Sequence, residues 1–221
     1  MRRYRAVIFD WDGTVMDSTR AIVASIQGAC VDLGLPVPDS RQASWVIGLS
    51  LESALYHAVP TLTADLVDDF QARYRAHYFS QDGQLPLFDG MDELLGALRG
   101  HGALLGVATG KSRAGLDRVL TQRGMHGQFD ITRCADETFS KPHPAMLLEI
   151  LDELCLEPDE VLMVGDTSHD MQMARNAGMD GLAVTYGAHD PEALSDGQPL
   201  AMVDSVAQMR EWLSTRVVVQ G

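Results

Sequence analysis

The segment Asp10-Trp11-Asp12-Gly13-Thr14 directly follows the apolar run Ala6-Val7-Ile8-Phe9, and this junction constrains the fold more than any other part of the chain. A short run of β-branched and aromatic residues predicts a buried strand, and the Asp-Gly pair behind it predicts a turn at its carboxyl end. Asp10 and Asp12 are two residues apart, so in an extended chain both carboxylates point to the same side. The sequence therefore predicts two acids at one edge of a sheet, either sharing a reaction centre or forming a solvated turn.

Short apolar runs alternate with helical patterns from residue 104 onward. In chain order they are a strand at 104–108, a helix at 112–123, a strand at 161–164, a helix at 168–177 and a strand at 182–184. This alternation predicts an α/β fold, a doubly wound parallel sheet with helices on both faces. The strand before Asp10 belongs to the same predicted sheet.

The periodicity is helical, with no strand pattern, between the first strand and the remaining ones. Residues 18–33 carry apolar side chains at helical spacing, and Ser18 is a suitable N-cap for that helix. A second helical pattern covers 63–78. We therefore expect an all-helical cap inserted into the α/β core and joined to it by two linkers, which permits hinge motion. The expected division is residues 17–86 for the cap and residues 1–16 with 87–221 for the core.

The composition excludes several classes of function. With 31 acidic and 17 basic residues the net charge is -14, so the surface repels nucleic acid and anionic lipid. No apolar segment approaches the about 18 residues of a membrane-spanning helix, and acids interrupt the first apolar run before it reaches the length of a signal peptide. We expect a cytoplasmic protein that binds neither nucleic acid nor membrane. The 3 cysteines form no Cys-x-x-Cys pair, which predicts reduced thiols and no zinc site.

Polar groups follow each predicted strand of the core, at the edge where doubly wound sheets bind ligands. Thr109-Gly110-Lys111 follows the second strand, Lys141-Pro142 opens a further helix, and Gly165–Asp170 follows a later strand. Taken singly, each group has a structural explanation, such as a surface lysine or an acidic helix cap. Taken together, they are the parts that phosphoryl transfer requires. Asp166 and Asp170 can face one cation with hard oxygen ligands, which suits magnesium.

These segments resemble the four signature segments of the haloacid dehalogenase superfamily of phosphohydrolases. The matching segments are Asp10–Val15, Thr109, Lys141 and Gly165–Asp170. The helical insertion is similar to the small mobile cap of one subgroup. Dehalogenases of the superfamily lack the second acid of the first segment, and ion-pumping ATPases have a threonine there. Asp12 therefore favours phosphate-ester hydrolysis.

The resemblance implies a role for each matching residue. Asp10 would attack phosphorus and form an aspartyl phosphate, while Asp12 would protonate the leaving group and later accept a proton from the attacking water. Thr109 and the backbone near Gly110 would hold phosphoryl oxygens, and Lys141 would offset their charge. The magnesium ligands would be Asp10, the main-chain carbonyl of Asp12, Asp166 and Asp170, the last either directly or through water.

A charge count predicts that the metal is required. Four carboxylates and one lysine leave an excess of three negative charges before a phosphate dianion enters. Two unit charges about 4 Å apart interact by roughly 4 kcal/mol at an effective dielectric constant of 20, which is enough to prevent useful binding. Mg²⁺ together with a proton on Asp12 would bring the excess to zero, so we expect the first step to need Asp12 protonated.

The expected substrate is a small phosphorylated metabolite. Tyr186-Gly187, the segment 141–144 and the position of the cap look like those of phosphoglycolate phosphatases, so 2-phosphoglycolate is the first candidate. Other readings are a phosphomutase of the β-phosphoglucomutase type, a pyrophosphatase, a nucleotidase, and a turnover-deficient regulatory or binding protein of the same fold. The sequence does not determine the oligomeric state.

Several other residues near these segments have two readings. Gly48-Leu49-Ser50 in the cap either contacts substrate or ends one helix and caps the next. Lys111 and Arg113 either meet a substrate carboxylate or are solvated in the first turn of a helix. His143 and His169 flank the expected site, and we expect both to be solvated loop residues.

Overall fold

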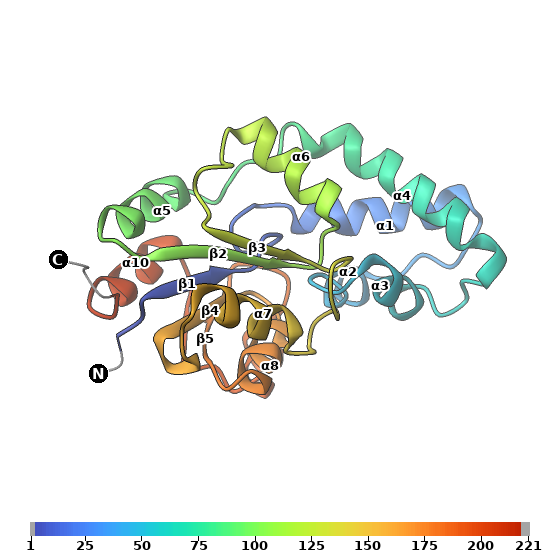
Figure 1. Cartoon of the computed structure of the whole chain (residues 1–221). Helices are drawn as coiled ribbons and strands as arrows, with labels where there is room; N and C mark the ends of the chain where they lie inside the picture. Colours follow the sequence, from blue (N-terminus) through green and yellow to red (C-terminus); the bar gives the residue numbers. More distant parts are fainter. Residues whose placement is uncertain (1–2, 218–221) are drawn as a thin grey trace.

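A parallel sheet of six strands forms the centre of the computed structural model, which describes residues 3–217 (Figure 1). The strand order is β3-β2-β1-β4-β5-β6, so the chain winds outward from β1 in both directions. The doubly wound α/β fold predicted from the sequence is confirmed. The strands are β1 (Ala6–Phe9), β2 (Leu104–Thr109), β3 (Ile131–Cys134), β4 (Val161–Gly165), β5 (Asp180–Val184) and β6 (Ala201–Val203).

Alternating side chains of β1 enter two different apolar cores. Val7 and Phe9 pack on one face of the sheet, and Ala6 and Ile8 pack on the other. A central strand of a parallel sheet is buried on both faces, which explains why its sequence is a continuous apolar run. The helices of the first face are α5 (Met91–Gly100), α6 (Arg113–Arg123) and α10 (Val206–Ser214). Those of the second are α7 (Ala145–Leu154) and α8 (Ser168–Asn176), and α9 (Pro191–Asp196) packs against α8.

The register of the central strands brings their carboxyl ends to one level. Phe9 of β1 is paired with Val107 of β2 and with Val164 of β4. The residues immediately beyond these three therefore emerge side by side at the same edge of the sheet. This is the edge to which the sequence assigned the polar segments.

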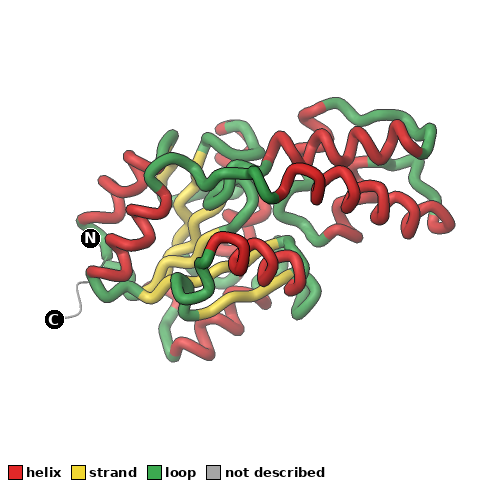
Figure 2. The backbone as a smooth tube through the Cα atoms, turned by 90° about the horizontal axis from the view of Figure 1, so that it is seen from above, coloured by secondary structure: helices red, strands yellow, loops and turns green. Residues whose placement is uncertain are grey.

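Four α-helices lie at this edge and have an apolar core of their own (Figures 1 and 2). They are α1 (Thr19–Asp32), α2 (Ser40–Trp45), α3 (Leu51–Ala58) and α4 (Val67–Asp82), with a short 3₁₀ helix at Ala64–Leu66. Ile26, Leu55 and Phe70 are among the buried side chains between them. We call this segment the helical insertion.

The structure differs from the expected elements in three places. The helix expected at 63–78 begins as a 3₁₀ turn and continues as α4 to Asp82, with Asp68 and Asp69 in the first turn, where acids are favourable. The helix expected to open at Lys141-Pro142 begins only at Ala145. Strands β3 and β6 were not predicted. Both lie at edges of the sheet, where a strand needs fewer apolar residues because it has one neighbour.

The remaining expectations concern cysteines, membranes and the end of the chain. Cys30 and Cys134 are buried, Cys155 is exposed, and all three are free thiols. Within residues 3–217 no helix has the length and apolar character to cross a bilayer. Val217 forms a parallel bridge with Tyr4. The tail or edge strand considered for 217–221 otherwise lies outside the described residues.

Candidate active site

Asp10 is the first residue beyond β1, and its side chain is completely buried. Its backbone N–H donates to the carbonyl of Val164, which fixes the chain at the end of the strand (2.8 Å). The turn behind it passes through Gly13 at a φ of +82°, a conformation that favours glycine. A Cβ atom at Gly13 would collide with the carboxylate of Asp166, so this glycine also lets the turn approach the next acid.

Lys141 forms ion pairs with two of the acids, Asp10 and Asp170. Its Nζ lies 2.6 Å from Oδ1 of Asp10 and 2.7 Å from Oδ1 of Asp170. The side chain of Lys141 has no exposed area, and those of its two partners have at most 1%. Burial alone would lower the pKa of Lys141, but the carboxylates of Asp10 and Asp170 attract its ammonium group. The net effect is a pKa above the usual value, so Lys141 stays charged.

Asp166 and Asp170 are held by the turn between β4 and α8. Oδ1 of Asp166 accepts a hydrogen bond from the Thr14 hydroxyl, and Oδ2 accepts one from the N–H of Ala188, both at 2.7 Å. Oδ2 of Asp170 accepts from the hydroxyl and the N–H of Thr167, whose own hydroxyl caps α8 in return. This reciprocal capping box fixes Asp170 in the first turn of the helix.

The acids form a cluster whose negative charge is only partly compensated. One oxygen from each of Asp10, Asp166 and Asp170 lies within 4.8 Å of the other two. Burial raises the pKa of Asp10 well above its usual range, and Asp170 and Asp166 raise it further, although Lys141 acts in the opposite direction. Burial and the charge of Asp170 also raise the pKa of Asp166, to about 7. Three carboxylates face one ammonium, so two negative charges lack a positive partner when all three are ionised.

The cluster fits a small divalent cation. Oδ2 of Asp10 is buried and has no hydrogen-bond partner among the described residues, so a strong acceptor is left pointing into the site. Buried carboxylates without enough positive charge beside them are costly, and a cation among the three acids would lower that cost. An all-oxygen donor set of this kind suits magnesium. Asp12 does not contribute its carboxylate to the cluster.

Thr109 and Gly110 bring the end of β2 to the same edge. Thr109 is completely buried, and its hydroxyl accepts a hydrogen bond from the N–H of Lys111 (3.2 Å). The backbone of the helical insertion passes over Gly110 so closely that a Cβ atom there would lie 2.6 Å from the carbonyl oxygen of Gly48. The absence of a side chain at Gly110 therefore lets the insertion reach the edge of the sheet.

Comparison with known proteins identifies the family. The model of the haloacid dehalogenase-like hydrolase family matches residues 7–184, which include all four polar segments. The chain belongs to the haloacid dehalogenase-like hydrolase family. The resemblance inferred from its motifs is confirmed, and so is the expectation that it is a hydrolase.

Relatives of this hydrolase cover nearly its whole length. A protein of Dickeya dadantii named probable phosphatase IndB is 36% identical over 209 residues, which are 92% of this chain and 90% of that protein. A phosphoglycolate phosphatase of Pectobacterium atrosepticum is 32% identical, over 93% of this chain and 90% of that one. The crystal structure of a predicted phosphoglycolate phosphatase from Haemophilus somnus superimposes with a TM-score of 0.85 at 26% identity, over 96% of this chain and 99% of the other.

Asp12 has its own partners, which differ from those of the other acids in this hydrolase. Oδ1 accepts a hydrogen bond from the hydroxyl of Ser18 (2.6 Å), and Oδ2 lies 3.0 Å from Nζ of Lys111. Ser18 precedes α1 as expected, but the prediction that its side chain caps the helix is wrong, because the hydroxyl is used by Asp12. Lys111 also donates to the hydroxyl of Tyr78 on α4 (3.0 Å). Asp12 is thereby held between the core and the helical insertion.

The loop Gly48-Leu49-Ser50 contains the helix cap that one of its two readings expected, and the substrate contact of the other reading stays a prediction. Ser50 caps α3, since its hydroxyl accepts from the N–H of Ser53, and its own N–H donates to the hydroxyl of Ser140 in the core (2.9 Å). The carbonyls of Gly48 and Leu49 face Gly110. The loop therefore lies directly above the acidic cluster, between Ser140 and Gly110.

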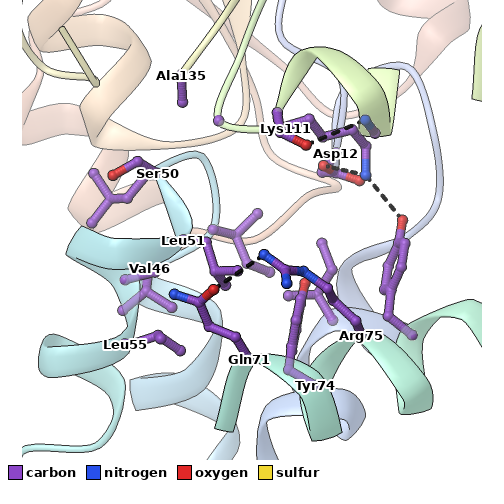
Figure 3. Close-up of a pocket in the computed structure, with 18 of the residues that line it drawn as sticks. Asp12, Val46, Ser50, Leu51, Leu55, Gln71, Tyr74, Arg75, Lys111 and Ala135 are labelled. Atoms are coloured by element: carbon purple, nitrogen blue, oxygen red, sulfur yellow. Dashed lines mark hydrogen bonds and ion pairs between the residues drawn. The ribbon is translucent and has the colours of Figure 1, made fainter. Parts of the chain in front are cut away.

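A cavity of about 760 Å³ lies between the helical insertion and the core (Figure 3). Asp12, Gly110 and Lys111 line it on the side of the sheet. The opposite wall comes from the insertion and is mostly apolar. A ligand in this cavity would be within reach of the polar edge.

His169 and Arg113 differ from what the sequence predicted. His143 is exposed as expected, but the prediction of a solvated His169 is wrong, because it is 4% exposed. Its Nε2 donates to the carbonyl of Trp45 on α2, and so does Nε2 of the buried His189 (2.9 and 3.0 Å). Arg113 is half-buried and pairs with Glu137 and Asp117, and it is not among the residues that line the cavity. His189 was missed because no local pattern links a residue at 189 to one at 45.

Proposed function

We propose that this hydrolase is a Mg²⁺-dependent phosphatase that hydrolyses a phosphate monoester of a small metabolite through an aspartyl phosphate on Asp10. The observation that supports it best is the buried cluster of Asp10, Lys141, Asp166 and Asp170 at the end of the central strands, with Asp12 beside it. Mg²⁺ bound by the acids would neutralise their charge and polarise a phosphoryl oxygen. A neutral ligand would leave the negative charge of these acids uncompensated.

In the first step Oδ2 of Asp10 attacks phosphorus. This oxygen is the one without a hydrogen-bond partner among the described residues, whereas Oδ1 is held by Lys141. Lys141 thus fixes the orientation of the nucleophile and offsets charge that the phosphate brings. The hydroxyl of Thr109 and the N–H of Gly110, at the end of β2, would donate to phosphoryl oxygens.

Asp12 is the proposed general acid and base. In the first step it protonates the leaving alkoxide as the ester P–O bond breaks. In the second step it takes a proton from the water that attacks phosphorus, and the bond from phosphorus to Asp10 breaks, which releases inorganic phosphate and the free carboxylate. Ser18 and Lys111 hold its two oxygens, so the carboxyl group keeps one orientation through both steps. Closure of the helical insertion over Gly110 excludes bulk water from the aspartyl phosphate. Mobility of residues 17–86 relative to the core is part of this proposal.

The relatives suggest a first substrate. Two of the proteins compared above carry the name phosphoglycolate phosphatase, so 2-phosphoglycolate is the first metabolite to assay. Its phosphate would occupy the acidic edge and its carboxylate would face the cavity.

The test compares the protein with its Asp10→Asn variant on p-nitrophenyl phosphate in the presence of Mg²⁺. We expect the variant to lose at least about a thousandfold in kcat, because the nucleophile is gone. Asp89→Asn, which changes an exposed acid of the core, is the matched control and should retain full activity. Equal rates in all three proteins would exclude Asp10 as the nucleophile, and no phosphate release from the unmodified protein would exclude a phosphatase. Conversion of glucose 1-phosphate to glucose 6-phosphate with little free phosphate would indicate a mutase instead.

A further inference from the structure

The cavity beside the active site is larger than the first candidate substrate requires. Its volume of about 760 Å³ lies within the range of roughly 300–1,000 Å³ that is usual for sites of drug-sized ligands. The two-carbon body of 2-phosphoglycolate would fill only a small part of it. If such a small ester is bound, the apolar walls stay in contact with water. They then contribute nothing to the binding free energy, because no apolar area is buried.

The wall contributed by the helical insertion is apolar over several turns. The side chains that form it come from α1, from α3 and from the turn between α2 and α3, and include Ile22, Ile26, Val46, Leu51 and Leu55. An apolar wall of this kind binds hydrocarbon by removing it from water, with a gain proportional to the buried area. These five side chains offer no hydrogen-bond partner to a polyol or to a second phosphate. The wall therefore favours a leaving group with an apolar body.

A single face of α4 adds polar groups to this cavity. Gln71 and Arg75 are four residues apart, as are Tyr74 and Tyr78, and all four line the cavity. Figure 3 shows the guanidinium group of Arg75 extended from α4 toward Gln71 and Leu51, into the space between the walls. Arg73, on the same helix, does not line the cavity.

Arg75 differs from the other cations of the cavity in its partner. Lys111 is paired with Asp12, and the guanidinium of Arg118 lies 3.7 Å above the ring of Phe79. Arg75 donates to the neutral Oε1 of Gln71 at 3.1 Å, and no carboxylate of the described residues pairs with it. A guanidinium group oriented by an amide toward an apolar cavity is suited to a planar anion, because it can donate two parallel hydrogen bonds to a carboxylate.

We propose that the substrate is a phosphate monoester whose leaving group combines an apolar body of several carbons with a carboxylate, which binds Arg75. This proposal rests on the phosphatase function proposed above and specifies its substrate class. The phosphate binds at the acidic edge, the hydrocarbon lies along the apolar wall, and the carboxylate reaches α4. The three parts of the cavity then each bind one part of the ligand.

Four esters with the same phosphate group test this substrate class. They are 2-phosphoglycolate, ethyl phosphate, hexyl phosphate and 6-(phosphonooxy)hexanoate, assayed by phosphate release in the presence of Mg²⁺. Each buried methylene should raise kcat/KM by up to about fourfold, so we expect hexyl phosphate to exceed ethyl phosphate by at least about tenfold. The carboxylate of 6-(phosphonooxy)hexanoate should add about tenfold more, which is typical of a hydrogen bond to a charged group.

The variant Arg75→Gln separates the carboxylate contact from the apolar wall. It should lower kcat/KM for 6-(phosphonooxy)hexanoate by about tenfold, mainly through KM, and leave hexyl phosphate within twofold. Arg73→Gln, which removes the same charge from the same helix outside the cavity, should change neither ester. A loss shared by both esters, or no loss at all, would overturn the role of Arg75.

The failure of this inference can be told apart from that of the function on which it rests. If 2-phosphoglycolate is hydrolysed at least tenfold more efficiently than both six-carbon esters, the phosphatase function stands and the substrate class proposed here is wrong. If none of the four esters nor p-nitrophenyl phosphate releases phosphate, the proposed function itself is wrong.

Discussion

Replacing Lys141 by methionine tests the electrostatic account of the site most sharply. The change removes the ammonium group that lies 2.6 Å from Asp10 and 2.7 Å from Asp170, while the side chain keeps most of its length and apolar volume. All three side chains are buried, so water cannot replace the lost partner. Removing one member of a buried ion pair typically costs about 3–5 kcal/mol. We expect a loss of that size in the unfolding free energy at pH 8 without divalent metal.

The second change in this experiment is Asp170→Asn in the Lys141→Met background. It removes one of the two acids that lost their partner, so the double variant should be at least about 1 kcal/mol more stable than Lys141→Met alone. Lys111→Met is the comparison, because Lys111 is the other lysine of the chain and pairs with a single acid at a site that is 12% exposed. It should cost less than Lys141→Met.

Urea unfolding followed by circular dichroism gives the four free energies. A loss below about 1 kcal/mol for Lys141→Met would refute the reasoning, since it would mean that the acids do not depend on the lysine. The same conclusion would follow if Asp170→Asn gave no recovery in the Lys141→Met background.

Three further predictions concern the proton carrier, the metal and pH. Asp12→Asn should lower kcat by about 10²–10⁴-fold while substrate still binds, and single-turnover kinetics with isothermal titration would contradict this if binding were lost instead. Full chelation with EDTA should abolish phosphate release and added Mg²⁺ should restore it; undiminished turnover after chelation would refute the metal requirement. Because burial raises the pKa of Asp166 from 3.8 to about 7, the folded protein without metal keeps a proton there that the unfolded chain has lost. The stability of the metal-free protein should therefore fall as the pH rises from 4 to 7. Mg²⁺ should then raise Tm more at pH 8 than at pH 5.5. An equal rise at both pH values would contradict the raised pKa of Asp166.

The centre of the fold could be predicted because its signals are local. The run from Ala6 to Phe9, residues 104–108 of β2 and strand β4 are continuously apolar, since parallel central strands are buried on both faces. Polar residues directly behind such runs must then emerge at one edge. Asp10, Thr109 and Asp166 are therefore predictable as residues of that edge from the sequence alone.

The edge strands and the helix boundaries were less predictable. Strand β3 contains Thr132 and Arg133, both half-buried, and its alternation over four residues is too short to be distinguished from a loop. Helix α7 starts only at Ala145, because the chain turns after Lys141. Lys141 itself pairs with Asp10, which is far away in the sequence. Neither feature has a local signal of its own.

Contacts between the helical insertion and the core were not predictable from the sequence. Ser18 is a residue type that often caps helices and stands at the start of α1, yet its hydroxyl donates a hydrogen bond to Asp12. Trp45 accepts hydrogen bonds from His169 and His189, which are 124 and 144 residues away along the chain. Such contacts depend on how two separately packed units meet, and a local pattern carries no information about that.

The most direct test of the whole account is a crystal structure of the protein with Mg²⁺ and beryllofluoride, which mimics a phosphoryl group on a carboxylate. We predict that beryllium is bound to Oδ2 of Asp10, with its fluorides near Thr109 and Lys141 and the cation among the acids. An adduct on a different residue, or none at Asp10 under conditions in which the protein releases phosphate from an ester, would contradict the claim that Asp10 is the nucleophile.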